Sequence, residues 1–319
     1  MTTAAPAELQ ERFGPYTLVR KIGQGGMAEV FLAYRDGQTQ GTKPVVIKRL
    51  HQELENNRDA VDLFLTEADV TMLLEHPNVI RVHDSGEVEG RYYIAMEYVH
   101  GKDLGQITDR LQQLSRKFDV DLAVHIAIEM LRGLSYVHNA KTVSGRALGV
   151  VHRDCTPSNI YVSTSGQVKL GDFGVAKLVG VEGWTMAGSL KGKLGYLSPE
   201  QIAGDSPTQS IDLWSASICL FEMLTMQRAF VGDNELEVML RIKAARVPRL
   251  RGRLFSKAEI DAVVPKPLIV ILEKALHKKE SNRYQTAAEL LAALEAYRAK
   301  NGRTYNEAEL VHELTKSLS

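Results

Sequence analysis

The pattern of apolar and polar residues divides the chain into a strand-rich part and a helical part. Strands are predicted from Tyr16 to Ala33, broken by a glycine-rich turn, and at residues 44–48, 79–84 and 92–99. Between the strands at 44–48 and 79–84, apolar residues at helical spacing predict one helix, Asn57–Leu74. His76-Pro77-Asn78 ends this helix. Helical spacing then predicts helices at residues 119–140, 210–225, 234–245, 267–277, 286–298 and 307–318. We therefore expect an α+β fold with its sheet near the N-terminus.

Composition narrows the class of protein. The chain has 319 residues, which is enough for two lobes, and 44% of them are apolar. Lys+Arg and Asp+Glu both number 39, so no basic excess indicates nucleic acid or an anionic membrane as a partner. The longest apolar runs are too short to span a bilayer, and residues 1–12 do not resemble a signal peptide. Two isolated cysteines suit a reducing cytoplasm, where we expect the protein.

Candidate chemistry is concentrated between Val150 and Gly174. His152-Arg153-Asp154 is followed by Asn159, then by a turn at Ser165-Gly166, then by Asp172-Phe173-Gly174. Two carboxylates and a carboxamide thus come from the ends of adjacent strands. That arrangement suits holding Mg²⁺ on a nucleotide and directing a hydroxyl at its terminal phosphate. The alternative is a polar turn beside a hairpin with a chance Asp-Phe-Gly, and the two motifs together favour phosphoryl transfer.

These motifs resemble those of the eukaryotic-like (Hanks-type) Ser/Thr protein kinases, and their residues are most similar to those of the bacterial branch. The resemblance covers residues 16–298. It implies a small lobe (16–97) with a five-stranded antiparallel sheet and one helix, a hinge (97–101) and a mainly helical large lobe (102–298), with ATP between the lobes. Residues 1–15 are expected to be an N-terminal arm, and residues 299–319 a helical extension.

The resemblance also implies a nucleotide site. Lys48 would hold the α- and β-phosphates, and Glu67 would form an ion pair with it; a lysine that reaches solvent and a solvated glutamate are the alternatives. The family's third glycine position is Ala28 here, which weakens the interpretation of the glycine-rich turn as a phosphate lid. The other residues implied around ATP are Ile22, Gly23, Gly25, Val30, Val46, Met96, Glu97, Val99 and Tyr161.

Catalytic roles follow from the same resemblance. Asp154 would orient the hydroxyl of a protein substrate and take its proton late, because catalysis of this kind depends mainly on positioning and charge stabilisation. Asn159 and Asp172 would hold Mg²⁺, with Mn²⁺ as an alternative. Asp212 would support the backbone of the catalytic loop.

An activation segment is implied between Gly174 and Ser198-Pro199-Glu200, and Arg283 would pair with Glu200. Thr185 and Ser189 match phosphosite positions of the family, and a phosphate there could order the segment through Arg153. Ordinary loop hydroxyls are the alternative. Autophosphorylation in trans would need a transient homodimer.

One departure from the family concerns two loops that should touch. Thr156 occupies the position of the usual catalytic-loop lysine, and Lys193 occupies the position of the usual activation-segment threonine. Lys193 is therefore a candidate catalytic residue that would reach the γ-phosphate from the activation segment. Two independent substitutions, with Lys193 solvated, are the alternative.

Two other function classes stay open. A small-molecule phosphotransferase would share the aspartate and asparagine chemistry, but it would not need a peptide-binding activation segment. A non-catalytic scaffold of the same fold would usually lack Lys48, Asp154 or Asp172, and all three are present. The extension at 299–319 either packs back on the large lobe or serves as a docking helix for a partner.

Overall fold

The computed structural model describes residues 10–37, 43–174, 193–245 and 264–318. These residues form two compact units. The first unit contains the described residues up to His76, then Ile80–Val99, and also Phe173 and Gly174. The second contains Pro77–Val79, His100–Asp172 and the described residues from Lys193 onward. Thr185 and Ser189 lie outside the described residues.

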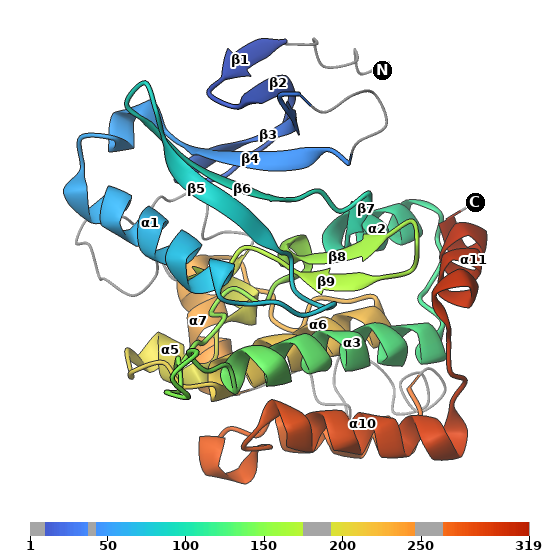
Figure 1. Cartoon of the computed structure of the whole chain (residues 1–319). Helices are drawn as coiled ribbons and strands as arrows, with labels where there is room; N and C mark the ends of the chain where they lie inside the picture. The colour runs from blue at the N-terminus through green and yellow to red at the C-terminus, as the bar shows by residue number, and fades with distance from the viewer. Residues whose placement is uncertain (1–9, 38–42, 175–192, 246–263, 319) are drawn as a thin grey trace. The chain divides into compact units, whose positions relative to one another are not determined.

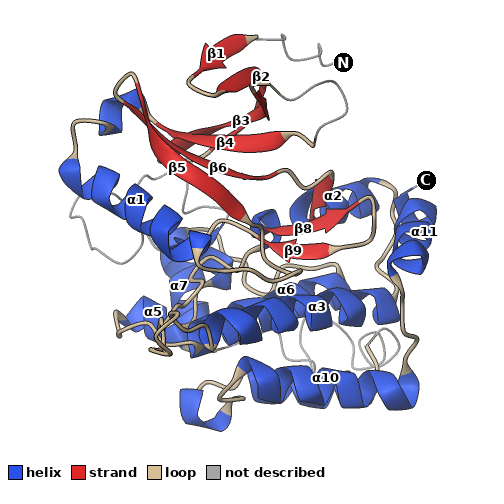
Figure 2. Ribbon diagram, in the orientation of Figure 1, coloured by secondary structure: helices blue, strands red, loops and turns tan. Residues whose placement is uncertain are grey.

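The first unit is built on an antiparallel sheet (Figure 2). Its six strands lie in the order β1-β2-β3-β4-β6-β5. Their bounds are β1 Glu11–Phe13, β2 Tyr16–Gln24, β3 Ala28–Arg35, β4 Val45–Leu50, β5 Val82–Val88 and β6 Arg91–Glu97. The helical elements are the short 3-10 helix η1, Gln52–Leu54, and the helix α1, Arg58–Met72.

Strand β1 is a correction to the expected five-stranded sheet and to the expectation that residues 1–15 form a loose arm. Its three residues are too few to show an alternating pattern, and it pairs with β2 across a two-residue turn, from Phe13 and Tyr16 to Glu11 and Leu18. Phe13 is 4% exposed and packs edge-on against Tyr93. Glu11 accepts a hydrogen bond of 2.8 Å from Arg49.

Helix α1 begins where Asn57 caps it, because the Asn57 side chain accepts a hydrogen bond from the backbone N–H of Ala60. Its buried face includes Val61, Phe64 and Ala68, which pack in one apolar cluster with residues of the sheet. Glu67 is also buried, at 8% exposure. Burying a carboxylate beside this cluster requires a partner for its charge.

The second unit contains a small antiparallel sheet, β7-β8-β9, and most of the helices (Figure 1). Its strands are β7 Gly101–Asp103, β8 Ile160–Ser163 and β9 Val168–Leu170. Its short 3-10 helices are η2 Pro157–Asn159, η4 Leu194–Tyr196 and η5 Glu280–Asn282. Its α-helices are α2 Leu104–Gln113, α3 Val120–His138, α5 Pro199–Ala203, α6 Ser210–Thr225, α7 Glu235–Lys243, α9 Lys266–Ala275, α10 Ala287–Asn301 and α11 Glu307–Leu318.

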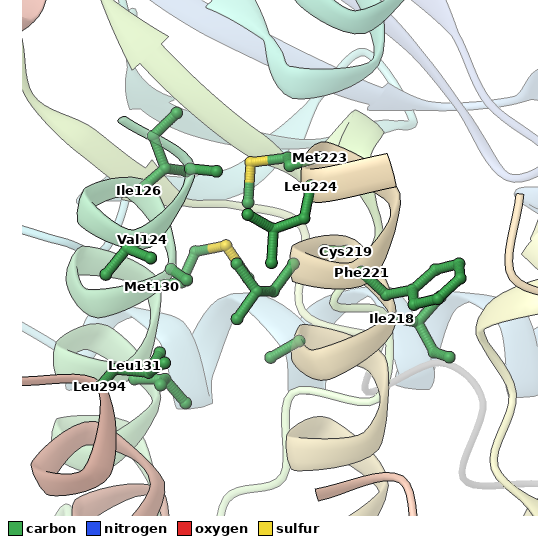
Figure 3. Packing of buried hydrophobic residues seen from close by; sticks show 14 of the residues in the cluster. Val124, Ile126, Met130, Leu131, Ile218, Cys219, Phe221, Met223, Leu224 and Leu294 are labelled. Carbon is green, nitrogen blue, oxygen red and sulfur yellow. The ribbon is translucent and has the colours of Figure 1, made fainter. Parts of the chain in front are cut away.

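The core of the second unit lies where α3 packs against α6 and α10 (Figure 3). Helix α6 is buried along nearly its whole length, which explains why its sequence lacks a polar face. Cys155 and Cys219 are unpaired and lie in this core, where burial raises the pKa of both thiols. Such thiols are structural rather than reactive. The side chains labelled in Figure 3 are Val124, Ile126, Met130, Leu131, Ile218, Cys219, Phe221, Met223, Leu224 and Leu294.

Helix α11 packs back on the second unit. Leu310 and Leu314 are buried in its core, and Arg116 donates a hydrogen bond of 2.7 Å to the backbone carbonyl of Lys316. Two of the apolar residues that a docking helix would offer to a partner are therefore already covered. Across the described ranges, no helix is both long and apolar enough to span a membrane.

Candidate active site

The backbone of the catalytic loop is held by hydrogen bonds to a buried carboxylate, that of Asp212. Asp212 on α6 is fully buried, and its two oxygens accept hydrogen bonds of 2.7 Å from the backbone N–H groups of His152 and Arg153. His138 on α3 completes the cluster, with its Nε2 atom 2.8 Å from Asp212. The expected support by Asp212 is therefore observed. The part of His138 was not predicted, because nothing in its helical position distinguishes it from a packing residue.

Two residues of the candidate site adopt left-handed backbone conformations. Arg153 has φ of 64° and Asp172 has φ of 50°. For residues other than glycine such a conformation costs about 1–2 kcal/mol, so surrounding contacts must hold it in place. Asp212 holds Arg153. Gly171, just before Asp172, is held by a hydrogen bond of 2.9 Å from its N–H to the carbonyl of Asn159.

Asp154 and Asn159 form one hydrogen-bonded pair. The Asn159 amide donates bonds of 2.9 Å to the backbone carbonyl of Asp154 and to its Oδ2 atom. Both residues are buried, with exposed fractions of 7% and 5%. Since the amide N–H groups are used inside the loop, the Asn159 side chain presents its carbonyl oxygen as the group for a ligand.

The β8–β9 hairpin brings Asn159 and Asp172 to the same end of the small sheet. Ile160 pairs with Leu170, so the residues just outside this pair, Asn159 and Gly171, are also adjacent. A carboxylate oxygen and a carboxamide oxygen are the hard ligands that Mg²⁺ binds. The described residues therefore fit a divalent metal ion at this position.

Lys193, from the segment before η4, contacts the catalytic loop at Asp154. Its ammonium nitrogen lies 2.5 Å from Oδ2 of Asp154. Lys193 immediately precedes η4, whose Leu194 and Tyr196 are buried in the core. Ser215 on α6 donates a hydrogen bond of 2.9 Å to the Tyr196 carbonyl. Thr156 instead has its hydroxyl 3.1 Å from that of Ser158.

The end of the activation segment is fixed by the expected ion pair. Arg283 donates hydrogen bonds of 2.6 and 2.9 Å to the two oxygens of Glu200. Burial pushes the pKa of Glu200 upward, but the hydrogen bonds and charge of Arg283 outweigh it, so the pKa lies below its usual value. Ser198, which replaces the family's alanine, caps α5 in a reciprocal arrangement with Gln201.

The first unit contains the predicted lysine–glutamate pair. Lys48 on β4 has its ammonium nitrogen 2.7 Å from Oε1 of Glu67 on α1. The two side chains are 16% and 11% exposed. Lys48 is therefore oriented by a nearly buried carboxylate and does not extend freely into solvent.

Four predicted nucleotide residues share one face of the first unit's sheet. Val30 on β3 pairs with Lys48, and Val46 pairs with Met96 on β6. Val46 and Lys48 are two residues apart on β4, so their side chains point to the same face. Of the other expected residues, Ile22 lies on β2, Glu97 ends β6, Val99 follows it, and Tyr161 lies on β8 of the second unit.

The glycine-rich turn closes between β2 and β3. Gly23 pairs with Val30, and the Gly25 N–H donates a hydrogen bond of 2.8 Å to the Ala28 carbonyl. The His51 ring lies 2.8 Å from the Gly25 carbonyl and holds the turn from β4's end. Ala28, 2% exposed, begins β3 and packs in the apolar cluster, so the side chain is accommodated at this position.

A second polar cluster was not predicted from the sequence. Tyr196 donates a hydrogen bond of 2.7 Å to Glu222, and Arg228 lies 3.1 Å from the same carboxylate. These residues line a cavity of about 60 Å³ that also contacts Pro157 of the catalytic loop. Burial raises the pKa of Glu222. The three residues come from separate elements, so no local pattern could have indicated their contact.

Comparisons with known proteins agree with this geometry. Residues 16–294 match the protein kinase domain family, and the chain belongs to that family. The expected α+β kinase-like fold and the resemblance to bacterial Ser/Thr kinases are thereby confirmed. The protein kinase family generally uses ATP and a divalent metal ion.

Relatives were found in several bacteria. The chain is 38% identical over 298 residues to the tyrosine-protein kinase MasK of Myxococcus xanthus, covering 93% of this chain and 45% of MasK. It is 34% identical over 276 residues to the probable serine/threonine-protein kinase PknB of Lactococcus lactis, covering 86% of this chain and 41% of that protein. The chain thus spans less than half of these relatives' length. The crystal structure of the Mycobacterium tuberculosis PknI kinase domain shares the fold, with a TM-score of 0.63, 23% identity, and coverage of 92% of this chain and 99% of that one.

Proposed function

We propose that this chain is an ATP-dependent protein kinase that transfers the γ-phosphoryl group to serine and threonine hydroxyls. The observation that carries the proposal is the grouping of Asp154, Asn159 and Asp172 at one end of the β8–β9 hairpin. The oriented Lys48–Glu67 pair of the first unit supports it.

The chain's residues have separate tasks in this reaction. Asp154 accepts a hydrogen bond from the acceptor hydroxyl and takes its proton as the new O–P bond forms. Lys48 donates to the α- and β-phosphate oxygens. Asn159 and Asp172 hold the metal, which we propose is Mg²⁺, and when bound it neutralises phosphate charge. The residues proposed to bind the nucleotide are Ile22, Gly23, Gly25, Val30, Val46, Met96, Glu97 and Val99 of the first unit and Tyr161 of the second.

The acceptor class is chosen from the relatives. PknB of Lactococcus lactis and PrkC of Bacillus subtilis, the latter 32% identical over 310 residues, are named serine/threonine kinases. MasK is named a tyrosine kinase and is 38% identical, so tyrosine is a second candidate acceptor.

Regulation is proposed on the same basis. Thr185 and Ser189, outside the described residues, are proposed autophosphorylation sites, and a transient homodimer would let one copy modify another. We place the reaction in the cytoplasm. A Thr185→Ala/Ser189→Ala double variant with wild-type activity would argue against the switch, and activation kinetics independent of enzyme concentration would argue against the dimer.

Two alternative functions are disfavoured by specific contacts. A non-catalytic scaffold has no need of the oriented Lys48–Glu67 pair or of the Asp154–Asn159 pair. A small-molecule phosphotransferase has no need of a peptide platform, and the buried Glu200–Arg283 pair anchors the segment that would form one.

The proposal is tested by incubating the protein with ATP labelled at the γ-phosphate, Mg²⁺ and an acceptor protein such as myelin basic protein. Label should appear on the protein, and acid hydrolysis should recover phosphoserine or phosphothreonine. Phosphotyrosine alone would replace the proposed acceptor with the second candidate. Absence of transfer with both Mg²⁺ and Mn²⁺ would contradict the proposed activity.

A further inference from the structure

A lysine of the activation segment contacts the carboxylate at the centre of the candidate site. Lys193 has its ammonium nitrogen 2.5 Å from Asp154, and its side chain is 34% exposed while that of Asp154 is 8% exposed. The Asp154 carboxylate is therefore nearly buried, whereas the Lys193 ammonium group is partly exposed to solvent. A pair with this difference in exposure offers the remaining N–H groups of the cation to a ligand.

We propose that Lys193 is a catalytic residue, whose ammonium group binds the transferring phosphoryl group while Asp154 holds it in place. This inference rests on the proposed function and adds to it. An ammonium group has three N–H donors, and among the residues that the structure describes the contact with Asp154 uses one of them. The others are available to phosphoryl oxygens, whose charge is stabilised by a fixed cation in a site shielded from water.

The catalytic loop itself provides little positive charge for this task. From His152 to Asn159, Arg153 is the sole lysine or arginine of the sequence. The backbone N–H of Arg153 donates a hydrogen bond of 2.7 Å to Asp212 on α6. Thr156 contributes a neutral hydroxyl that lies 3.1 Å from Ser158. Lys193 therefore supplies a positive charge that Thr156 does not.

Charge balance also requires a cation near Asp154. A carboxylate and a phosphate repel each other, and at reduced dielectric this repulsion is a substantial barrier to approach. With Lys193 bound, Asp154 and the lysine together carry no net charge. As the acceptor oxygen bonds to the γ-phosphorus, the bond to the bridging oxygen breaks and ADP leaves with that electron pair. The acceptor proton passes to Asp154, and Lys193 keeps its own protons.

The position of Lys193 depends on how the next residues are anchored. Leu194 and Tyr196 are 3% and 4% exposed in the core, and Ser215 of α6 binds the Tyr196 carbonyl. The cation therefore comes from the activation segment and is held by the docking of η4 on α6. If η4 separated from α6, the site would lose this charge while Asp154 and Asn159 kept their hydrogen bonds to each other.

The test compares Lys193→Ala, Lys193→Arg and the exchange Thr156→Lys/Lys193→Thr, with labelled ATP-Mg²⁺ and myelin basic protein as acceptor. Lys193→Ala should lower kcat by about one to three decades, as expected for loss of one charge-stabilising group, with KM for ATP unchanged. Lys193→Arg should retain more activity than Lys193→Ala. The exchange should recover much of the loss, because it returns a lysine to the site from the loop. Lys300→Ala, which removes an exposed lysine of α10, is the control for loss of charge and should match wild type.

Three results would overturn the inference. A kcat of Lys193→Ala equal to that of wild type would exclude a catalytic role. A loss that neither Lys193→Arg nor the exchange repairs, together with a lower melting temperature, would assign Lys193 to structural support alone. A rise in KM for ATP that accounts for the whole loss would make it a nucleotide-binding residue. Lack of transfer by the wild-type protein is distinguishable from these results, because it would contradict the proposed function itself.

Discussion

The guanidinium of Arg283 binds the Glu200 carboxylate in a bidentate pair, donating hydrogen bonds of 2.6 Å to Oε1 and 2.9 Å to Oε2. Arg283 is 3% exposed and also donates to the His277 carbonyl at 2.8 Å. Its guanidinium carbon lies 4.7 Å from the centroid of the Trp214 ring. This one side chain thus connects the start of α5, the end of α9 and the core of α6.

Removing either member of this pair should leave a buried charge without its partner. We predict that Glu200→Gln or Arg283→Ala lowers the free energy of unfolding by about 3–5 kcal/mol. The measurement is urea denaturation followed by circular dichroism. The control is Arg241→Ala, which breaks the more exposed Arg241–Glu237 pair of α7 and should cost about 0.3–0.5 kcal/mol. Equal losses for the two pairs would contradict the assignment of burial as the cause.

The Glu200 carboxylate should also make the stability of the protein depend on pH. The pKa of Glu200 is lower in the folded protein than its usual value of about 4.3, so the unfolded state binds the proton more readily. Its contribution to stability is therefore complete above the unfolded pKa and is lost as the pH falls through the folded pKa. The stability difference between wild type and Glu200→Gln should be constant near neutral pH and shrink at acid pH. A difference that grows on acidification would have the wrong sign.

Substitution of two glycines with nearly equal φ, Gly166 and Gly145, distinguishes the cost of backbone strain from the cost of a steric clash. Gly166 has φ of +86°, and a Cβ atom there would lie 2.2 Å from the Glu307 carbonyl at the start of α11. Gly145 has φ of +83°, and no atom of the described residues would lie within 4 Å of a Cβ atom there. Gly145→Ala should cost about 1 kcal/mol from strain alone. Gly166→Ala should cost more and should increase proteolysis within α11, and equal costs would argue against the packing of α11 on this turn.

Asp212 provides a test of the catalytic-loop support. An asparagine has one acceptor oxygen in place of two, so Asp212→Asn cannot accept from both His152 and Arg153. Leaving a buried N–H without an acceptor costs about 1–3 kcal/mol. We predict a loss of stability of that size in urea denaturation and a lower kcat. Wild-type values for both quantities would show that the loop holds its conformation without this carboxylate.

The sequence predicted most of the fold because its elements have local signals. Helix α1 has both an asparagine cap and an apolar face, and α3 begins at Asp119, which caps it. Strand β1 was missed because three residues, of which Phe13 alone is apolar, carry no period. Its stability comes from Tyr93 and Arg49, which are distant in sequence.

The site was predicted where motif spacing fixes a role. The pairs Lys48–Glu67 and Glu200–Arg283 were expected because each of the four residues matches a position in the family's motifs, and both pairs are observed. The contact of His138 with Asp212 and the Tyr196–Glu222–Arg228 cluster were not expected. Each joins residues from different elements, and such contacts are set by packing, which a one-dimensional pattern does not encode.

Asp154 takes the proton of the acceptor hydroxyl and does not itself bind the nucleotide, and Asp154→Asn tests this role most directly. Asparagine keeps an oxygen for the hydrogen bond from Asn159, so the loop should keep its shape, but it cannot take the acceptor proton as the carboxylate does. Label transfer from ATP to protein should fall by about two to four decades, the usual contribution of a general base. Binding of ATP-Mg²⁺, measured by calorimetry on the same sample, should match wild type. Near-normal transfer by Asp154→Asn would contradict the account.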